Sequence, residues 1–177
     1  EGSYPSGSAA GQVVAENPAF AARCIIAQQK SIRGPARGYW HPNPGRGLSD
    51  ELIAVVAGRE IAPNVLDPTS LHLLTVQTPE LAHYELLEGN WRLIAVWHVY
   101  SGGTIRGVHA ENDDKHALAP AAGDLLNPEA VSCFIRLTHE RYYAHLHEHF
   151  GTTVVAMFTD EPSVLGRGAQ RGPNPWP

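Results

Sequence analysis

Two adjacent carboxylic acids, Asp160 and Glu161, close an apolar, β-branched run and are followed directly by Pro162. A pair of carboxyl groups can work as general acid and as nucleophile or base when their surroundings set different pKa values. Glu161 is the better candidate for the acid because its longer side chain reaches further into a cleft. Residue types alone leave a structural alternative open, in which both acids cap a turn or pair with Arg167 or Arg171.

The residues before these acids predict the elements that would position them. Residues 128–149 repeat apolar side chains at three- and four-residue steps, which is typical of a helix with one buried face. Gly151 can end that helix, and the apolar run 152–158 is typical of a strand covered on both faces. A helix followed by a buried strand indicates an α/β fold, whose active sites lie at the carboxyl ends of strands.

The rest of the chain predicts a different kind of structure. Asn17-Pro18 is a helix-start signal, so we expect a short helix over 19–26, whereas 34–49 is rich in Gly and Pro and predicts loops. Between 51 and 100, short apolar runs alternate with Gly, Pro, Asn and Asp, which predicts an antiparallel β region. The expected strands are 52–57, 71–76 and 91–99.

Composition excludes some classes of partner. The chain has 177 residues with 43% hydrophobic and 18% charged residues and a net charge of −5, which is a globular composition. Without a Lys/Arg cluster, we expect neither nucleic acid nor an anionic membrane as a partner. No apolar run approaches the ~18 residues of a membrane span. Cys24 and Cys133 sit in apolar runs and are expected to be buried free thiols.

Other side chains suggest chemistry only weakly. His139, His145, His147 and His149 do not form the His-Glu-x-x-His zinc pattern, because Tyr143 stands where the second His is required. We therefore predict no metal and no cofactor. Five aromatic residues could stack on sugar rings or anchor the core, and Trp176 is the best placed of them to line a cleft. These residues are Tyr39, Trp40, Trp91, Trp97 and Trp176.

Several segments together point to a family. They are 124–130 (DLLNPEA), Phe134-Ile135, 138–142, Phe150-Gly151, Phe158-Thr159-Asp160-Glu161-Pro162, Arg106-Gly107-Val108-His109 and the opening loop 1–9, which contains Pro5-Ser6-Gly7. In order and spacing they resemble a family of largely uncharacterised bacterial glycoside-hydrolase-like (β/α)-barrel proteins. The resemblance covers 1–26 and 101–177.

The resemblance implies a partial (β/α)8 TIM-type barrel with an inserted antiparallel β region, in a piece of a longer protein, because a whole barrel takes roughly 250 residues. Residues 1–33 would be a barrel βα segment, 34–105 the β-rich insertion, and 106–177 the barrel helix, strand and active-site loop. The remainder of the barrel, in the parent chain, would be a partner.

The resemblance also implies roles for single residues. Glu161 would be the general acid/base of glycoside hydrolysis, and a carbohydrate substrate would contact Glu1, Tyr4 and Ser6. From their places at and after the expected strand end, we add Asp160 and Trp176 to the residues that contact the substrate. For Tyr4 and Ser6 the alternative is a plain turn made by Pro5-Ser6-Gly7. The second carboxylate would follow a later strand, beyond Pro177, so the chain alone is expected to be inactive.

Two other functions stay open from the sequence. One is a non-catalytic carbohydrate-binding or scaffold module that keeps barrel-like segments without chemistry. The other is a metal-dependent hydrolase that uses the histidines. The sugar, the stereochemical outcome and the localisation do not follow from the sequence.

Overall fold

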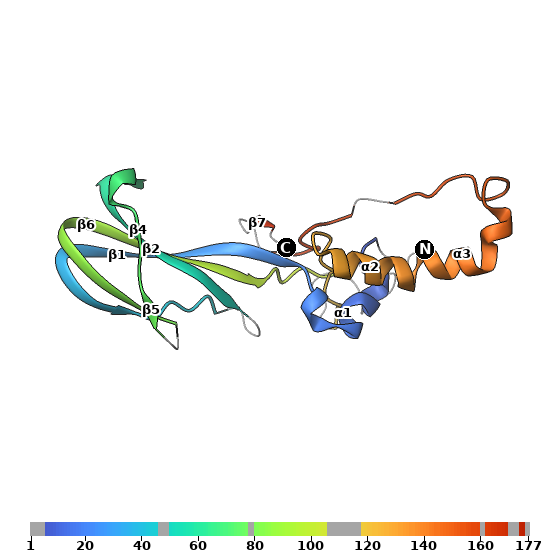
Figure 1. The fold of residues 1–177 in the computed structure, drawn as a ribbon, viewed down its shortest axis with the longest axis horizontal. Helices are drawn as coiled ribbons and strands as arrows, with labels where there is room; N and C mark the ends of the chain where they lie inside the picture. Colours follow the sequence, from blue (N-terminus) through green and yellow to red (C-terminus); the bar gives the residue numbers. More distant parts are fainter. Residues whose placement is uncertain are drawn as a thin grey trace. The chain divides into compact units, whose positions relative to one another are not determined.

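The computed structural model describes residues 6–45, 50–77, 80–105, 118–159, 162–169 and 174–175. The chain divides into two compact units (Figure 1). The sheet unit is Ile25–Val99, and the helical unit combines Glu1–Cys24 with Tyr100–Pro177. Each unit is described by itself below.

Three long strands dominate the sheet unit, in the order β2, β6, β1 (Figure 1). Shorter strands extend the sheet: β3 and β4 pair with β2, and β5 pairs with β6, each antiparallel. The bounds are β1 (Arg23–Trp40), β2 (Glu51–Ala62), β3 (Val65–Leu66), β4 (His72–Leu73), β5 (Val76–Gln77) and β6 (Leu81–Tyr100), with a 3-10 turn η3 (Pro68–Ser70) between β3 and β4.

Alternating burial along β6 builds the core of the sheet unit. The odd-numbered residues from Trp91 to Val99 are buried, whereas the even-numbered ones between them are partly exposed. In the antiparallel register with β2, Ala57 lies opposite Leu93. Directly opposite residues share a face, so these side chains pack on one side of the sheet. Trp40 and Tyr84 pack against the same core.

The helical unit contains two longer helices and several short turns. Its elements are η1 (Ala9–Gly11), α1 (Gln12–Glu16), η2 (Pro18–Phe20), α2 (Pro128–Leu137), α3 (His139–Leu146), η5 (His147–His149) and β7 (Asn174–Pro175). Val13 of α1 and Ala130, Cys133 and Leu137 of α2 form its buried cluster. Asn127 starts α2 because its side chain accepts hydrogen bonds from the backbone of Glu129 and Ala130 at 2.9 and 3.5 Å.

The expected partial (β/α)8 barrel is wrong. The protein is mostly antiparallel sheet, with 44% of the described residues in strands and bridges and 24% in helices. The key error lies at 152–158, where a buried parallel strand was expected after the helix. Phe150 and Val154 instead form an isolated bridge around a turn, and Val155 and Phe158 are 78% and 88% exposed. A β-branched run becomes a strand only where neighbouring strands pair with it and cover its faces.

Other expected elements also changed. The helix expected over 19–26 is wrong, since η2 ends at Phe20 and Cys24, Ile25 and Ile26 belong to β1. Strand β1 also continues to Trp40, through residues expected to be loop. The helix expected over 128–149 is interrupted at Thr138, whose hydroxyl donates to the carbonyl oxygen of Phe134 at 2.6 Å. The strands expected at 52–57 and 91–99 lie within β2 and β6, whereas 71–76 contains only the short β4 and the start of β5.

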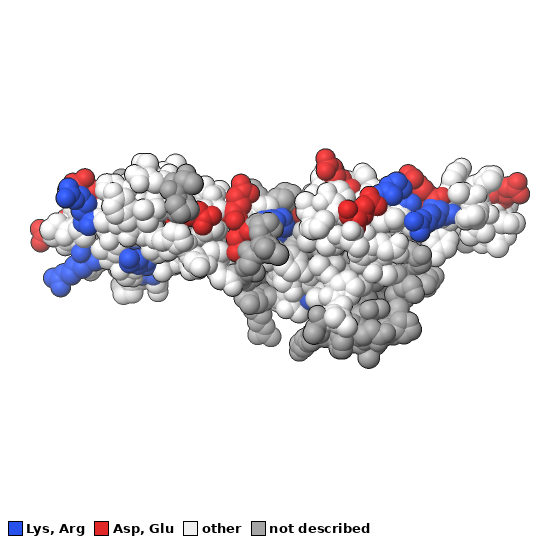
Figure 2. All heavy atoms as spheres, turned by 90° about the horizontal axis from the view of Figure 1, so that it is seen from below, with Lys and Arg blue, Asp and Glu red and all other residues white. Residues whose placement is uncertain are grey.

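The boundaries between the two units lie at 24/25 and 99/100, whereas the boundaries expected from the sequence lie at 33/34 and 105/106. On the face shown in Figure 2, acidic and basic side chains lie next to one another and form no continuous basic surface. Within the described residues, no helix is both long enough and apolar enough to cross a membrane.

The core of the sheet unit makes a prediction about stability. Leu93→Ala empties a fully buried position and is expected to lower the free energy of unfolding by about 2–5 kcal/mol, measured by urea denaturation. Leu87→Ala, on the same strand but 78% exposed, is the matched control and should change it by no more than about 0.5 kcal/mol. Equal effects of the two substitutions would contradict this core.

Candidate functional site

The loop that begins at Ser6 is fastened to residues 123–125 of the helical unit. The buried Ser8 hydroxyl accepts a hydrogen bond from the backbone N–H of Gly123 at 2.9 Å. Gly7 has a φ of +79°, and a Cβ added there would lie 2.0 Å from Cδ2 of Leu125. Only glycine fits this backbone and this contact. Two segments that carry the family resemblance are therefore in direct contact.

Ser6 also contacts a third of these segments. Its Oγ lies 2.5 Å from Oγ1 of Thr159, and either hydroxyl can be the donor. The two residues are 153 positions apart in the sequence. The contact places the Pro-Ser-Gly loop beside the residue that is covalently joined to Asp160. Among the predicted site residues, Ser6 is described, whereas Glu1, Tyr4, Asp160, Glu161 and Trp176 lie outside the described residues.

The chain that follows Pro162 is tied to residues 101–104. The fully buried Ser101 donates its hydroxyl to the carbonyl oxygen of Leu165 at 2.7 Å. Thr104 and Arg167 exchange two backbone hydrogen bonds, at 2.8 and 2.9 Å. Hydrogen bonds therefore tether the chain before residue 160, through the side chain of Thr159, and after residue 161, through the backbone of 165–167.

A hollow of about 500 Å³ lies between α1, η2 and α2. Glu16 and Arg136 form an ion pair at its rim. The hydrogen bond from Arg136 lowers the pKa of Glu16, and the same bond raises the pKa of Arg136. Burial raises the pKa of the Cys133 thiol. A thiol held in its protonated form is a poor nucleophile, so this hollow offers no activated cysteine.

A second, more apolar hollow of about 330 Å³ is formed by α3 and by Phe150 and Met157, which follow it in the sequence. Tyr143 and Phe150 meet edge to face there, with ring centroids 5.4 Å apart, and Met157 completes the wall. It contains one carboxylate, that of Glu140. One carboxylate in an apolar hollow does not supply the acid and base pair that hydrolysis needs.

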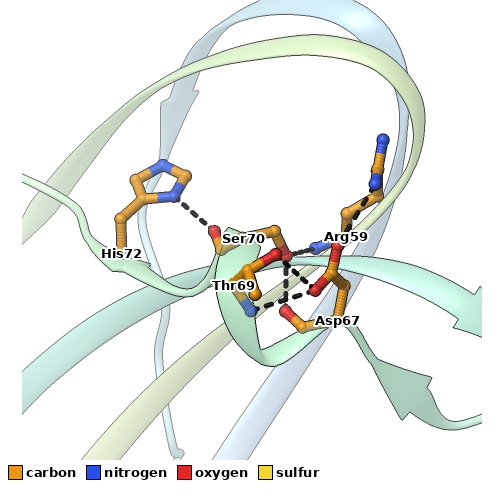
Figure 3. Close-up of polar contacts among 5 residues, drawn as sticks. All are labelled: Arg59, Asp67, Thr69, Ser70 and His72. Atoms are coloured by element: carbon orange, nitrogen blue, oxygen red, sulfur yellow. Dashed lines mark hydrogen bonds and ion pairs between the residues drawn. The ribbon is translucent and has the colours of Figure 1, made fainter.

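The sheet unit contains a polar cluster that includes the residue types of a serine hydrolase: Asp67, Ser70 and His72 (Figure 3). Their hydrogen bonds are incompatible with that chemistry. The Ser70 hydroxyl donates to the backbone oxygen of Asp67 at 2.7 Å and accepts from the Arg59 N–H at 2.8 Å. Nδ1 of His72 lies 2.9 Å from the backbone oxygen of Ser70 rather than near its hydroxyl. The cluster is thus a structural turn and not a nucleophile with its base.

Asp67 is the centre of this turn. Its Oδ1 accepts hydrogen bonds from the Thr69 hydroxyl at 2.6 Å and from the Thr69 N–H at 2.9 Å, and its Oδ2 pairs with Arg59 at 3.1 Å. The Thr69 hydroxyl makes the largest contribution to a lowered pKa of Asp67, and Arg59 a smaller one. The sequence offered a signal for this turn that was not used, because Asp67 followed by Pro68 is a helix-start pattern.

Metal ligation finds no support in the described part of the chain. No group of three or more His, Cys, Asp or Glu side chains there is arranged to hold a metal ion. The four histidines at 139–149 instead contact neighbouring rings or end the helix: His139 packs on Phe134, and His147 on Tyr143. The acidic run Glu111-Asn112-Asp113-Asp114 lies outside the described residues.

The Asp67 turn generates a prediction about pH. Thr69→Val is expected to raise the pKa of Asp67 toward its ordinary value, as followed by NMR titration of its carboxyl carbon. A lowered folded-state pKa stabilises the fold above the unfolded-state pKa, and this contribution is lost as pH falls through the folded-state pKa. The stability difference between the parent protein and Thr69→Val should therefore shrink on acidification. Arg59→Gln should raise the pKa less, and an unchanged pKa in Thr69→Val would refute the assignment.

Comparisons with known proteins find no match for this chain. No family model matches its sequence, no curated protein is detectably similar to it, and no solved structure matches its fold. The resemblance to glycoside-hydrolase-like proteins thus stays a prediction, and the observation that bears on the site is the contact between Ser6 and Thr159.

Proposed function

We propose that this chain takes part in glycoside hydrolysis, with Glu161 as the general acid/base. In this proposal Asp160, Glu1, Tyr4, Ser6 and Trp176 contact the carbohydrate. The observation that carries it is the 2.5 Å hydrogen bond between Ser6 and Thr159. The proposal does not depend on a barrel fold. It rests on the contact between the loop of Ser6 and the segment of Thr159, and on the carboxyl chemistry of Glu161.

The contact between the Ser6 loop and the segment 158–162 supports the proposal, because a single substrate molecule must contact both of them. Residue types suggest the segment 158–162 for the acid, and the family resemblance implies substrate contacts for the loop that contains Glu1, Tyr4 and Ser6. A side-chain hydrogen bond between Ser6 and Thr159 joins the two segments. The backbone around both is held by further bonds, at Ser8 to Gly123 and at Ser101 to Leu165. A rigid support of this kind suits catalytic groups, which must be held in a fixed geometry.

Hydrolysis also needs a second carboxyl group, which stands about 5–5.5 Å from the first in retaining enzymes and about 6.5–9.5 Å away in inverting ones. Asp124 is a buried acid within the fastened segment 123–125, but its Oδ1 accepts from the N–H of Leu126 at 2.9 Å and so shapes a turn. We therefore assign it no part in the reaction.

The role of Glu161 is tested through the leaving group. In the longest natural polypeptide that contains these residues, Glu161→Gln should lower kcat/KM for alkyl glycosides by about 10²–10⁴-fold, because their poor leaving group needs a proton. Dinitrophenyl glycosides leave without that proton, so protonation by Glu161 is not needed for their departure. Glu148→Gln, at an exposed position of the same unit, is the control. Equal losses on both substrates, or no loss at all, would rule out Glu161 as the acid.

The role of Ser6 has a separate test. Ser6→Ala removes the hydroxyl that meets Thr159, and a single hydrogen bond of this kind contributes about 0.5–1.5 kcal/mol. We expect KM for the glycoside to rise about 2–10-fold while kcat changes little, in steady-state kinetics. Ser132→Ala, in the hollow beside α2, is the matched control and should leave KM unchanged. A KM unaffected by Ser6→Ala would separate this loop from the substrate.

A further inference from the structure

The sheet unit presents an exposed aromatic ring that is held in place from one side. Tyr39, near the end of β1, is 54% exposed. Its ring lies 5.1 Å from the imidazole of His83 on β6, between centroids, at an interplanar angle of 51°. The His83 backbone N–H is bonded to the Thr75 carbonyl oxygen at 3.0 Å. Tyr39 therefore has a fixed neighbour at its side and a large ring area open to solvent.

Because successive side chains of a strand point to opposite faces of the sheet, the residues that share a face with Tyr39 can be identified. Trp40 on β1 and Tyr84 on β6 pack against the core. Gly38 permits this, because a Cβ there would lie 2.8 Å from the Tyr84 hydroxyl oxygen. The odd-numbered residues next to Trp40 and Tyr84 face the opposite side of the sheet. Tyr39 and His83 thus share the outer face with Arg37 and Glu85, which are both exposed. We call these four residues the Tyr39 strip.

The chemistry of the Tyr39 strip matches one class of ligand. A sugar ring has an apolar face of C–H groups, which packs on an aromatic ring, and hydroxyls that both donate and accept hydrogen bonds. Arg37 can only donate and Glu85, when ionised, can only accept. Their charges cancel, so the strip does not favour an anionic ligand such as nucleic acid. An aromatic ring with two rotatable bonds also loses little entropy when it binds.

We propose that the Tyr39 strip is a binding site for neutral oligosaccharides, with Tyr39 as the stacking platform and Arg37 and Glu85 as hydroxyl partners. The site lies in the sheet unit, whereas the hydrolysis proposal concerns residues of the helical unit. It is independent of that proposal, since binding here needs neither Glu161 nor a second carboxylate.

Affinity electrophoresis through gels that contain soluble xylan, galactomannan, hydroxyethyl cellulose or starch tests the site. The unmodified protein should be retarded by at least one of these polysaccharides. Tyr39→Ala should weaken that retardation about 5–13-fold, as expected for a lost stacking contact of roughly 1–1.5 kcal/mol. Tyr39→Phe keeps the ring and should retain most of the affinity. Arg37→Ala and Glu85→Gln should each weaken binding by a smaller factor.

The controls separate this site from the catalytic proposal and from misfolding. Tyr142→Ala removes a ring of comparable exposure, 45%, from the helical unit and should leave retardation unchanged. Glu161→Gln should also bind as the unmodified protein does. Circular dichroism and urea denaturation check that Tyr39→Ala is folded. Absence of retardation in all four gels would overturn the proposal, as would retardation that Tyr39→Ala does not weaken.

Discussion

Strand β6 is the element on which the rest of the structure depends. Its 20 residues are flanked by β1 on one side and by β2 and β5 on the other. Buried backbone groups must find hydrogen-bond partners, and a central strand satisfies both of its edges. That pairing fixes which side chains face inward, because a register shift of one residue would turn Trp91, Leu93 and Trp97 outward. The placement of His83 beside Tyr39 follows from the same register.

The last residues of β6 pass directly into the scaffold of the candidate catalytic site. Tyr100 donates its hydroxyl to the Gly103 carbonyl oxygen at 2.7 Å, and burial raises its pKa. The next residue, Ser101, bonds to Leu165, which lies just beyond residues 160 and 161. The continuous segment of β6 and Ser101 therefore contributes both to the support of the Tyr39 strip and to the support of the segment proposed for catalysis. Neither support depends on a barrel.

Local sequence patterns predicted those elements whose surroundings agree with their intrinsic preference. The apolar run over 91–99 predicted a strand, and β6 contains it, because both neighbours of that strand are present. The β-branched run at 152–158 also predicted a strand and failed, because no strand among the described residues pairs with it along its length and Phe158 is exposed. The prediction for residues 24–26 was wrong in the opposite way, because these residues were expected in a helix and belong to strand β1. Propensity is weak beside such tertiary pairing.

The candidate site was predictable only in part, for a related reason. Ser6 could be named from its loop, but its contact with Thr159 depends on how distant segments fold together, which spacing does not reveal. The Asp67 turn was local and carried its own signal in Asp67-Pro68. Tyr39 was one of five aromatics that could be core or platform, and its exposure distinguishes it from Trp91 and Trp97, which are buried.

The two proposed activities act on different properties of a substrate, and that difference explains how they would combine. A binding strip tethered to a hydrolytic group raises the local concentration of a substrate only if one molecule can engage both. A long polysaccharide can do so, whereas a single aryl glycoside cannot. The strip would thus lower the concentration of polymer needed for hydrolysis without changing the chemical step, because binding that is equal in the ground state and the transition state does not raise kcat. Tyr39 would govern the choice of polymer, and Glu161 the rate of bond cleavage.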